Sequence, residues 1–208
     1  MKHPVWRGGV LRVALLGMLA VSGCQTLPDV PEQKYYRLLA EPAPGGPAQP
    51  TLLPGELVVR PLLADGVYAE RAIVYSDEQQ RQLQQYHYHY WLYPPTHLVQ
   101  EHLAGRLRQD GVASVVRLDR PSGETAYAVS GRIARFDRIV AANHATASVA
   151  LELRLEKKSR VLWRKTYAAS EATADTRMVG FTTAMETALN RLYGEFFKDL
   201  RQLKPDKE

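Results

Sequence analysis

Residues Ala145 to Glu156 read ATASVALELRLE, and from Ser148 onward large apolar side chains alternate with small or polar ones. Successive side chains of a strand point to opposite faces, so this alternation predicts a strand with one buried face. The buried face would carry Val149, Leu151, Leu153 and Leu155. The other face, with Glu152, Arg154 and Glu156, is expected to be solvated or thinly covered.

Two more long strands are predicted on either side of this one in the sequence. Residues 127–140 precede it, and residues 161–168 (VLWRKTYA) follow it after a connection, 156–160, that is short enough for a hairpin. Three long strands in succession indicate an antiparallel meander in the C-terminal half of the chain.

The N-terminal half contributes shorter strands. Their aromatic and β-branched content predicts them at residues 34–39, 56–62, 72–76, 82–91 and 112–118. Residues 41–54 contain five prolines and two glycines, so we expect a surface loop there.

Two amphipathic helices complete the pattern. The first opens at Pro94, Pro95 and Thr96, where proline suits the first turn and threonine can cap it, and it ends at Asp110-Gly111. The second begins at an Asp175 cap and runs to about Leu203. Residues at helical spacing, nearly all of them apolar, form their inner faces: Leu98, Val99, His102, Leu103 and Leu107 in the first, and Met178, Phe181, Met185, Ala188, Leu189, Leu192, Phe196 and Leu200 in the second.

Together these elements predict one α/β domain over residues 34–204. Two main helices would cover a mixed, largely antiparallel sheet, giving a single three-layer or two-layer sandwich.

The first 23 residues have the three parts of a secretory signal peptide. Lys2 and Arg7 are basic, and residues 10–20 are apolar apart from one arginine but too short to span a bilayer. The next four residues, 21–24 (VSGC), resemble the lipobox of bacterial lipoproteins, whose cysteine thiol receives a diacylglyceryl group. Cys24 is the only cysteine in the chain, so we expect lipidation there. The alternative is an ordinary signal peptide with a cysteine by chance.

The mature chain would begin with a lipid-bearing tether, residues 24–33. Gln25 to Gln33 is polar with two prolines and reaches roughly 28 Å when extended. Gln25 at the second mature position favours the periplasmic face of the outer membrane of a Gram-negative bacterium. Loss of three cations with the signal lowers the net charge from +5 to +2, which does not favour binding to nucleic acid.

No pattern for enzyme chemistry or a cofactor is recognisable. There is no G-x-S-x-G elbow and no glycine-rich phosphate loop ahead of a helix. His87 and His89 are spaced so that a strand would point both to one face, as a metal pair would require. No further ligand set accompanies them, so a solvated or stacked aromatic strand is the expectation, with no functional metal. Met178 and Met185 fit either a lipid slot or core filling, and we expect core filling.

Several features of the chain occur together in one known family: the lipobox at Cys24, residues 35–38 (YYRL), the strand at 72–75, the aromatic run ending at Trp91, the strands at 129–136 and 149–155, and the final helix. In these features the chain resembles the ABC-type transport auxiliary lipoprotein family, whose best-known members are the PqiC-like proteins. The resemblance implies a fold similar to the N-terminal domain of TolB and no catalytic residues. It also implies a role beside an MCE-domain protein and an inner-membrane ABC permease or related subunit in lipid transport that maintains envelope integrity.

The aromatic run 86–93 is the candidate partner surface. Its members Tyr86, Tyr88, Tyr90 and Trp91 are of the types that anchor protein interfaces. The partner would be the end of an MCE tunnel or a neighbouring copy in a homo-oligomeric ring. Alternatively, Trp91 and its neighbours pack inside the domain. At the level of function, the alternative is a free-standing lipoprotein that binds a small ligand or a cell-wall component.

Overall fold

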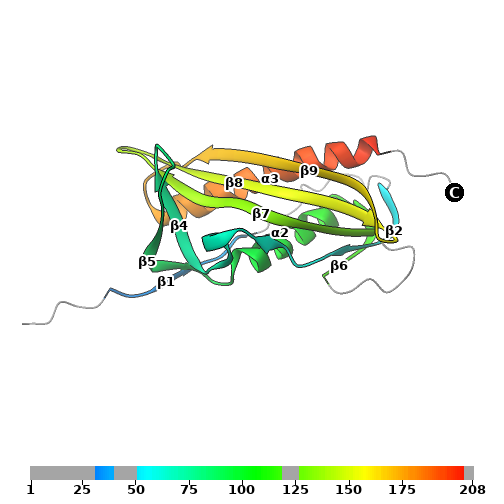
Figure 1. The fold of residues 1–208 in the computed structure, drawn as a ribbon, viewed down its shortest axis with the longest axis horizontal. Helices are drawn as coiled ribbons and strands as arrows, with labels where there is room; N and C mark the ends of the chain where they lie inside the picture. Colours follow the sequence, from blue (N-terminus) through cyan, green and yellow to red (C-terminus); the bar gives the residue numbers. More distant parts are fainter. Residues whose placement is uncertain (1–30, 40–50, 119–126, 204–208) are drawn as a thin grey trace, which may run out of the picture. The chain divides into compact units, whose positions relative to one another are not determined.

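Three long strands form the centre of the sheet. The computed structural model describes residues 31–39, 51–118 and 127–203, and in it β7 (Tyr127–Val140), β8 (Ala145–Lys157) and β9 (Arg160–Ala172) pair antiparallel in sequence order. This is the predicted meander, and Figure 1 shows the three strands running side by side along the domain. β9 is longer at both ends than its apolar residues indicated, because its whole length pairs with β8.

The other edge of β7 is shared by three shorter strands. β2 (Leu53–Val59), β3 (Leu63–Ala64) and β4 (Ala72–Asp77) pair in parallel with successive parts of β7. β6 (Ala113–Arg117) adds to β2, and β5 (Leu83–Trp91) adds to β4 and carries β1 (Lys34–Tyr36) at its outer edge. Five of the eight pairings among the described strands are parallel, whereas the two longest ladders are antiparallel.

Two boundaries differ from expectation. β2 begins at Leu53, inside the predicted proline-rich loop, because the Leu53 amide bonds to the carbonyl of Val112 beside β6. β1 ends at Tyr36 instead of residue 39, since the backbone then leaves β5 and the amide of Leu39 bonds to Glu186. Residues 41–50 of the predicted loop lie outside the described residues.

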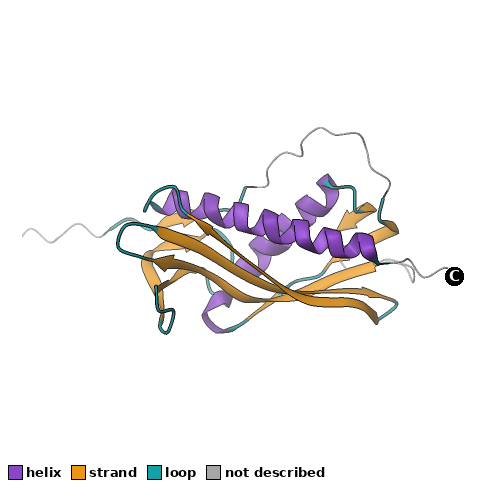
Figure 2. Cartoon of the chain, turned by 90° about the horizontal axis from the view of Figure 1, so that it is seen from above, coloured by secondary structure: helices purple, strands orange, loops and turns teal. Residues whose placement is uncertain are grey.

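Helices α2 (Pro95–Gln109) and α3 (Met178–Gln202) lie on the same side of the sheet, as Figure 2 shows. The rings of His102 and Tyr193 are 5.7 Å apart and join the two helices. Every residue of the two predicted inner stripes is buried. Of the two predicted arrangements, the domain that begins at Gln33 therefore has two layers, a mixed sheet and one layer of helices.

The helix starts differ from the predicted caps. Pro94 is the N-cap residue of α2, so Thr96 lies already inside the first turn and makes no capping bond. Arg177 is the N-cap of α3, and Asp175 instead accepts a hydrogen bond of 2.8 Å from the Arg177 backbone amide in the preceding turn. The end of α2 is as predicted, since Gly111 adopts a left-handed φ of 60° directly after it.

The predicted register of β8 is confirmed. Leu151, Leu153 and Leu155 have no exposed surface and face the helices. The opposite face is less solvated than expected at two positions, Ser148 and Glu156, which are both buried. Glu156 forms ion pairs with Arg60 at 2.9 Å and with Arg154 at 3.1 Å.

Candidate functional site

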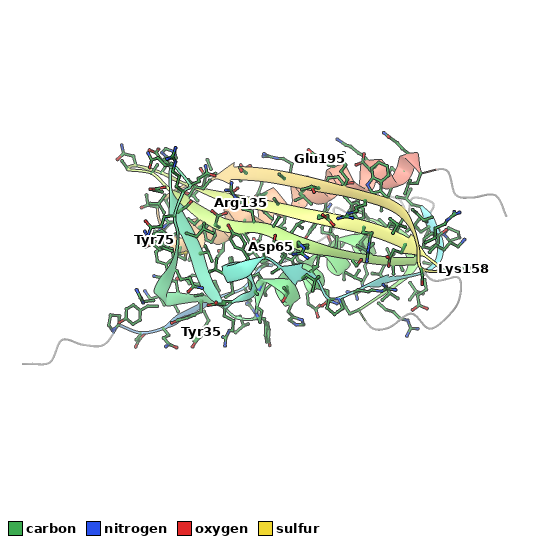
Figure 3. All side chains as sticks on the ribbon, in the orientation of Figure 1. Tyr35, Asp65, Tyr75, Arg135, Lys158 and Glu195 are labelled. Atoms are coloured by element: carbon green, nitrogen blue, oxygen red, sulfur yellow. The ribbon has the colours of Figure 1, made fainter. Side chains whose placement is uncertain are left out.

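Exposed and partly exposed tyrosines lie where β1 meets β5. β1 pairs Tyr35 with Tyr90, and their ring centroids are 5.8 Å apart. The guanidinium of Arg71 lies over the Tyr35 ring, 5.3 Å from its centroid. Tyr35 is 50% exposed and Tyr88 is 39% exposed. We call Tyr35, Arg71, Tyr88 and Tyr90 the aromatic edge; Figure 3 shows Tyr35 at the same end of the domain as Tyr75.

The other side of β1 and β5 is a packed polar contact. The Tyr36 hydroxyl lies 2.9 Å from Nδ1 of His89, and the His89 ring meets Tyr86 edge-on at 5.5 Å. Arg138 donates a short hydrogen bond to the Tyr86 hydroxyl. Burial, with nearby Lys34 and Arg138, lowers the pKa of His89, so this imidazole is neutral at pH 7. Tyr86 is therefore held within the domain and presents little surface to a partner.

Trp91 is a core residue, which corrects its inclusion in the partner surface. Its side chain is 1% exposed and packs on Phe136 at 5.2 Å and Phe181 at 5.9 Å between ring centroids. It ends β5, where the chain turns under α3, so its large apolar ring fills the space between sheet and helix. The residues of the predicted surface are thus divided: Tyr88 is exposed, Tyr90 is partly exposed and Trp91 is buried.

The two histidines do not act as a pair. His89 packs between Tyr36 and Tyr86, whereas His87 is exposed and its ring lies beside Tyr88. A register irregularity in the β4–β5 ladder interrupts simple alternation between these positions. Among the described residues no group of three His, Cys, Asp or Glu side chains is placed to hold a metal ion.

Sequence reasoning missed two members of the aromatic edge, Tyr35 and Arg71. Tyr35 belongs to a three-residue strand that pairs in parallel with a strand more than fifty residues away, and no local pattern reveals such a pairing. The adjacent tyrosines 35 and 36 were the one available signal, since only one of two neighbouring strand residues can face the core.

Exposed tyrosines with one arginine can bind a protein, because these residue types offer large rigid contact area and hydrogen-bond donors. The lipidation residue Cys24 and the neighbouring Gln25 lie outside the described residues. In the part of the chain that the structure describes, no helix is both long and apolar enough to cross a membrane.

Residues 36–195 match the model of a protein family described as the ABC-type transport auxiliary lipoprotein component. Among solved structures, protein XCC0632 from Xanthomonas campestris is similar, with 22% identity and a TM-score of 0.66 over 78% of this chain and 91% of that one. An uncharacterized protein is also similar, with 11% identity and a TM-score of 0.66 over 82% and 99% of the two chains. Identities this low show the fold alone. No curated protein matches the chain.

Proposed function

Because this chain belongs to the family of ABC-type transport auxiliary lipoprotein components, we propose that it is a non-enzymatic outer-membrane subunit of an MCE-type lipid transport system. In this role it holds the periplasmic MCE protein near the outer membrane, while the inner-membrane ABC permease supplies the energy. The observation that carries the proposal is the family match, which spans almost the whole described domain.

The position of β1 supports a docking role close to the lipid anchor. Lys34, the first residue of β1, follows Cys24 by ten residues. At ~3.1 Å per residue for an extended tether, β1 stays within roughly 31 Å of the lipid. The aromatic edge lies on β1 and β5, so a partner bound there is held beside the membrane that carries the anchor.

Tyrosine truncation tests this role. Tyr88→Ala and Tyr90→Ala, one at a time in the full lipidated chain, are expected to lower recovery of the MCE protein in affinity purification from native membranes. A central interface tyrosine contributes about 2 kcal/mol, or roughly thirtyfold in affinity. Both variants should keep the wild-type melting temperature, because neither side chain lies in the core.

Val115→Ala is the matched control, since this side chain is 45% exposed on β6, a strand that pairs with β2 and not with β5. Wild-type recovery of the MCE protein by both folded tyrosine variants would exclude the aromatic edge as the interface. Absence of an MCE protein from the wild-type purification, with a small molecule or cell-wall fragment bound instead, would favour a free-standing lipoprotein.

A further inference from the structure

The sheet face turned away from the helices carries a row of arginines. Arg154 of β8 stands directly opposite Arg164 of β9, and Ser130 of β7 completes that row. In the next row, Arg132 of β7 stands opposite Glu152 of β8. Alternation places all these side chains on the face opposite Leu153. Figure 3 shows Asp65, at the margin of this region, beside the central strands.

These side chains line a surface hollow of about 590 Å³, which we call the arginine hollow. The segment that follows β2, which includes Arg60, lines one side of the hollow. The backbone amide of Arg60 donates to the carbonyl of Val129 of β7 at 2.8 Å. Gly131 lets this segment pack tightly, because a Cβ there would collide with the carbonyl of Glu152 and lie 3.1 Å from Leu62 Cδ2. Ligand sites typically have volumes of roughly 300–1,000 Å³.

The charges of the hollow are unequal. Four guanidiniums (Arg60, Arg132, Arg154 and Arg164) line it together with one carboxylate, Glu152. Arg164 pairs with Glu152 at 2.9 Å, and Arg132 pairs with Asp65. Arg60 and Arg154 share the two oxygens of a single carboxylate, Glu156. Four positive charges are thus matched by three negative ones.

Two features of this arrangement favour a bound anion. Like charges directly opposite each other on neighbouring strands are destabilising, and Arg154 and Arg164 stand in that relation. Each guanidinium also has five N–H donors, whereas the ion pairs and the Ser130 contact engage one nitrogen each of Arg60, Arg154 and Arg164. Further N–H donors of these lining residues are therefore available to a bound anion.

We propose that the arginine hollow binds a phosphate group, as inorganic phosphate or as the phosphodiester of a lipid headgroup. Guanidinium groups match phosphate oxygens in bidentate geometry, and a tetrahedral phosphate can bridge two or more of them. Bound between Arg154 and Arg164, it removes the repulsion of the cross-strand pair. The arginine hollow shares no residue with the aromatic edge, so its test does not depend on the MCE partner.

The test uses full-length lipidated protein in dodecyl maltoside, a detergent without phosphate, and isothermal titration calorimetry. The probes are inorganic phosphate, dihexanoylphosphatidylglycerol below its micelle concentration, and dihexanoylglycerol, which lacks the phosphate. We expect one saturable site for at least one phosphate probe and none for dihexanoylglycerol. Binding of inorganic phosphate identifies the free ion as sufficient, whereas binding of the phospholipid alone identifies the headgroup.

Variants distinguish the hollow from general attraction to a basic surface. Arg154→Gln and Arg164→Gln are each expected to weaken binding about tenfold or more, since a hydrogen bond between charged groups is lost. Arg117→Gln is the matched control, because Arg117 is an exposed arginine paired with Glu56 outside the hollow. Glu152→Gln removes the one carboxylate of the lining and should tighten binding about two- to fivefold.

The expected increase in phosphate affinity of Glu152→Gln keeps the proposal testable even if an arginine variant fails to fold. The proposal is overturned if no phosphate probe binds the wild-type protein. It is equally overturned if Glu152→Gln binds no more tightly than wild type and the folded arginine variants bind as well as Arg117→Gln.

Discussion

His102 has the most strongly perturbed histidine pKa among the described residues. It lies on the inner face of α2, where its Nε2 donates to the carbonyl of Leu39 at 3.3 Å and its ring faces Tyr193. Its pKa is lowered to about 4, chiefly by burial and to a smaller extent by Arg106, while the bond to Leu39 opposes the shift. Protonation would add an N–H group at Nδ1. This buried nitrogen has no hydrogen-bond partner among the described residues.

This shift makes stability depend on pH. An unfolded histidine binds its proton near pH 6.5 and the folded one near pH 4, so the unfolded state holds more protons between these values. The contribution is fully present above about pH 6.5 and is lost as the pH falls toward 4, up to roughly 3 kcal/mol. Urea unfolding of the wild type and of His102→Gln across this range should show a steeper loss for the wild type.

His97→Gln is the control for this comparison, since His97 is an exposed residue of the same helix. A pH profile for His102→Gln parallel to that of the wild type would contradict a buried neutral imidazole. Asp137, whose pKa is raised by burial, titrates in both proteins and so does not affect the difference between them.

At the scale of one strand, the neighbouring residues Glu152 and Leu153 of β8 point to opposite faces of the sheet. Leu153→Asp places a carboxylate among apolar side chains and is expected to lower the free energy of unfolding by several kcal/mol, enough to unfold the domain. Glu152→Lys breaks a partly exposed pair with Arg164 and places a lysine opposite Arg132 on the solvated face, so its effect should be about 1–2 kcal/mol, well below that of Leu153→Asp. Circular dichroism and thermal melts measure both, and equal melting temperatures would mean that the register is wrong.

The β8–β9 hairpin has a turn that its residues do not favour. Lys158 and Ser159 both adopt left-handed backbone angles, with φ of 49° and 64°, between the paired residues Lys157 and Arg160. Glycine adopts this conformation without the steric cost of a Cβ atom. Ser159→Gly should therefore raise the free energy of unfolding by about 1 kcal/mol in urea titrations. Ser159→Ala retains the Cβ atom and should give no such gain.

At the scale of the whole molecule, membrane attachment is expected to depend on one atom. Cys24→Ser replaces the thiol that would carry the lipid with a hydroxyl that cannot form the thioether. Metabolic labelling with a palmitate analogue should therefore give a labelled wild-type protein and an unlabelled, unprocessed or soluble variant. Label on the serine variant would remove the assignment of Cys24.

Sorting between membranes is a separate prediction, which concerns the next residue. Gln25→Asp places the residue associated with inner-membrane retention at the second mature position, so the protein should shift toward the inner-membrane fraction of a sucrose gradient. Gln25→Asn, which adds no charge, is the control. Unchanged fractionation of Gln25→Asp would count against the outer-membrane proposal.

The strand 145–156, the two helix faces and the C-terminal meander could all be read from the amino-acid order. Their signal is periodicity: a buried face recurs every two residues in a strand and about every 3.6 in a helix, so neighbours along the chain reveal it. Leu153 and Phe181 are buried where that pattern places them.

The features that concern function arise from contacts between residues distant in the sequence. The burial of Trp91 by Phe136 and Phe181 and the pairing of Tyr35 with Tyr90 follow from the order of strands in the sheet. So does the arrangement in which Arg60 shares Glu156 with Arg154. Periodicity shows which face of a strand is buried, but not which strand lies beside it. Packing over the whole core determines which strands are neighbours in the sheet. Only this packing buries Trp91 while leaving Tyr88 exposed, and only this packing brings the arginines of the hollow together.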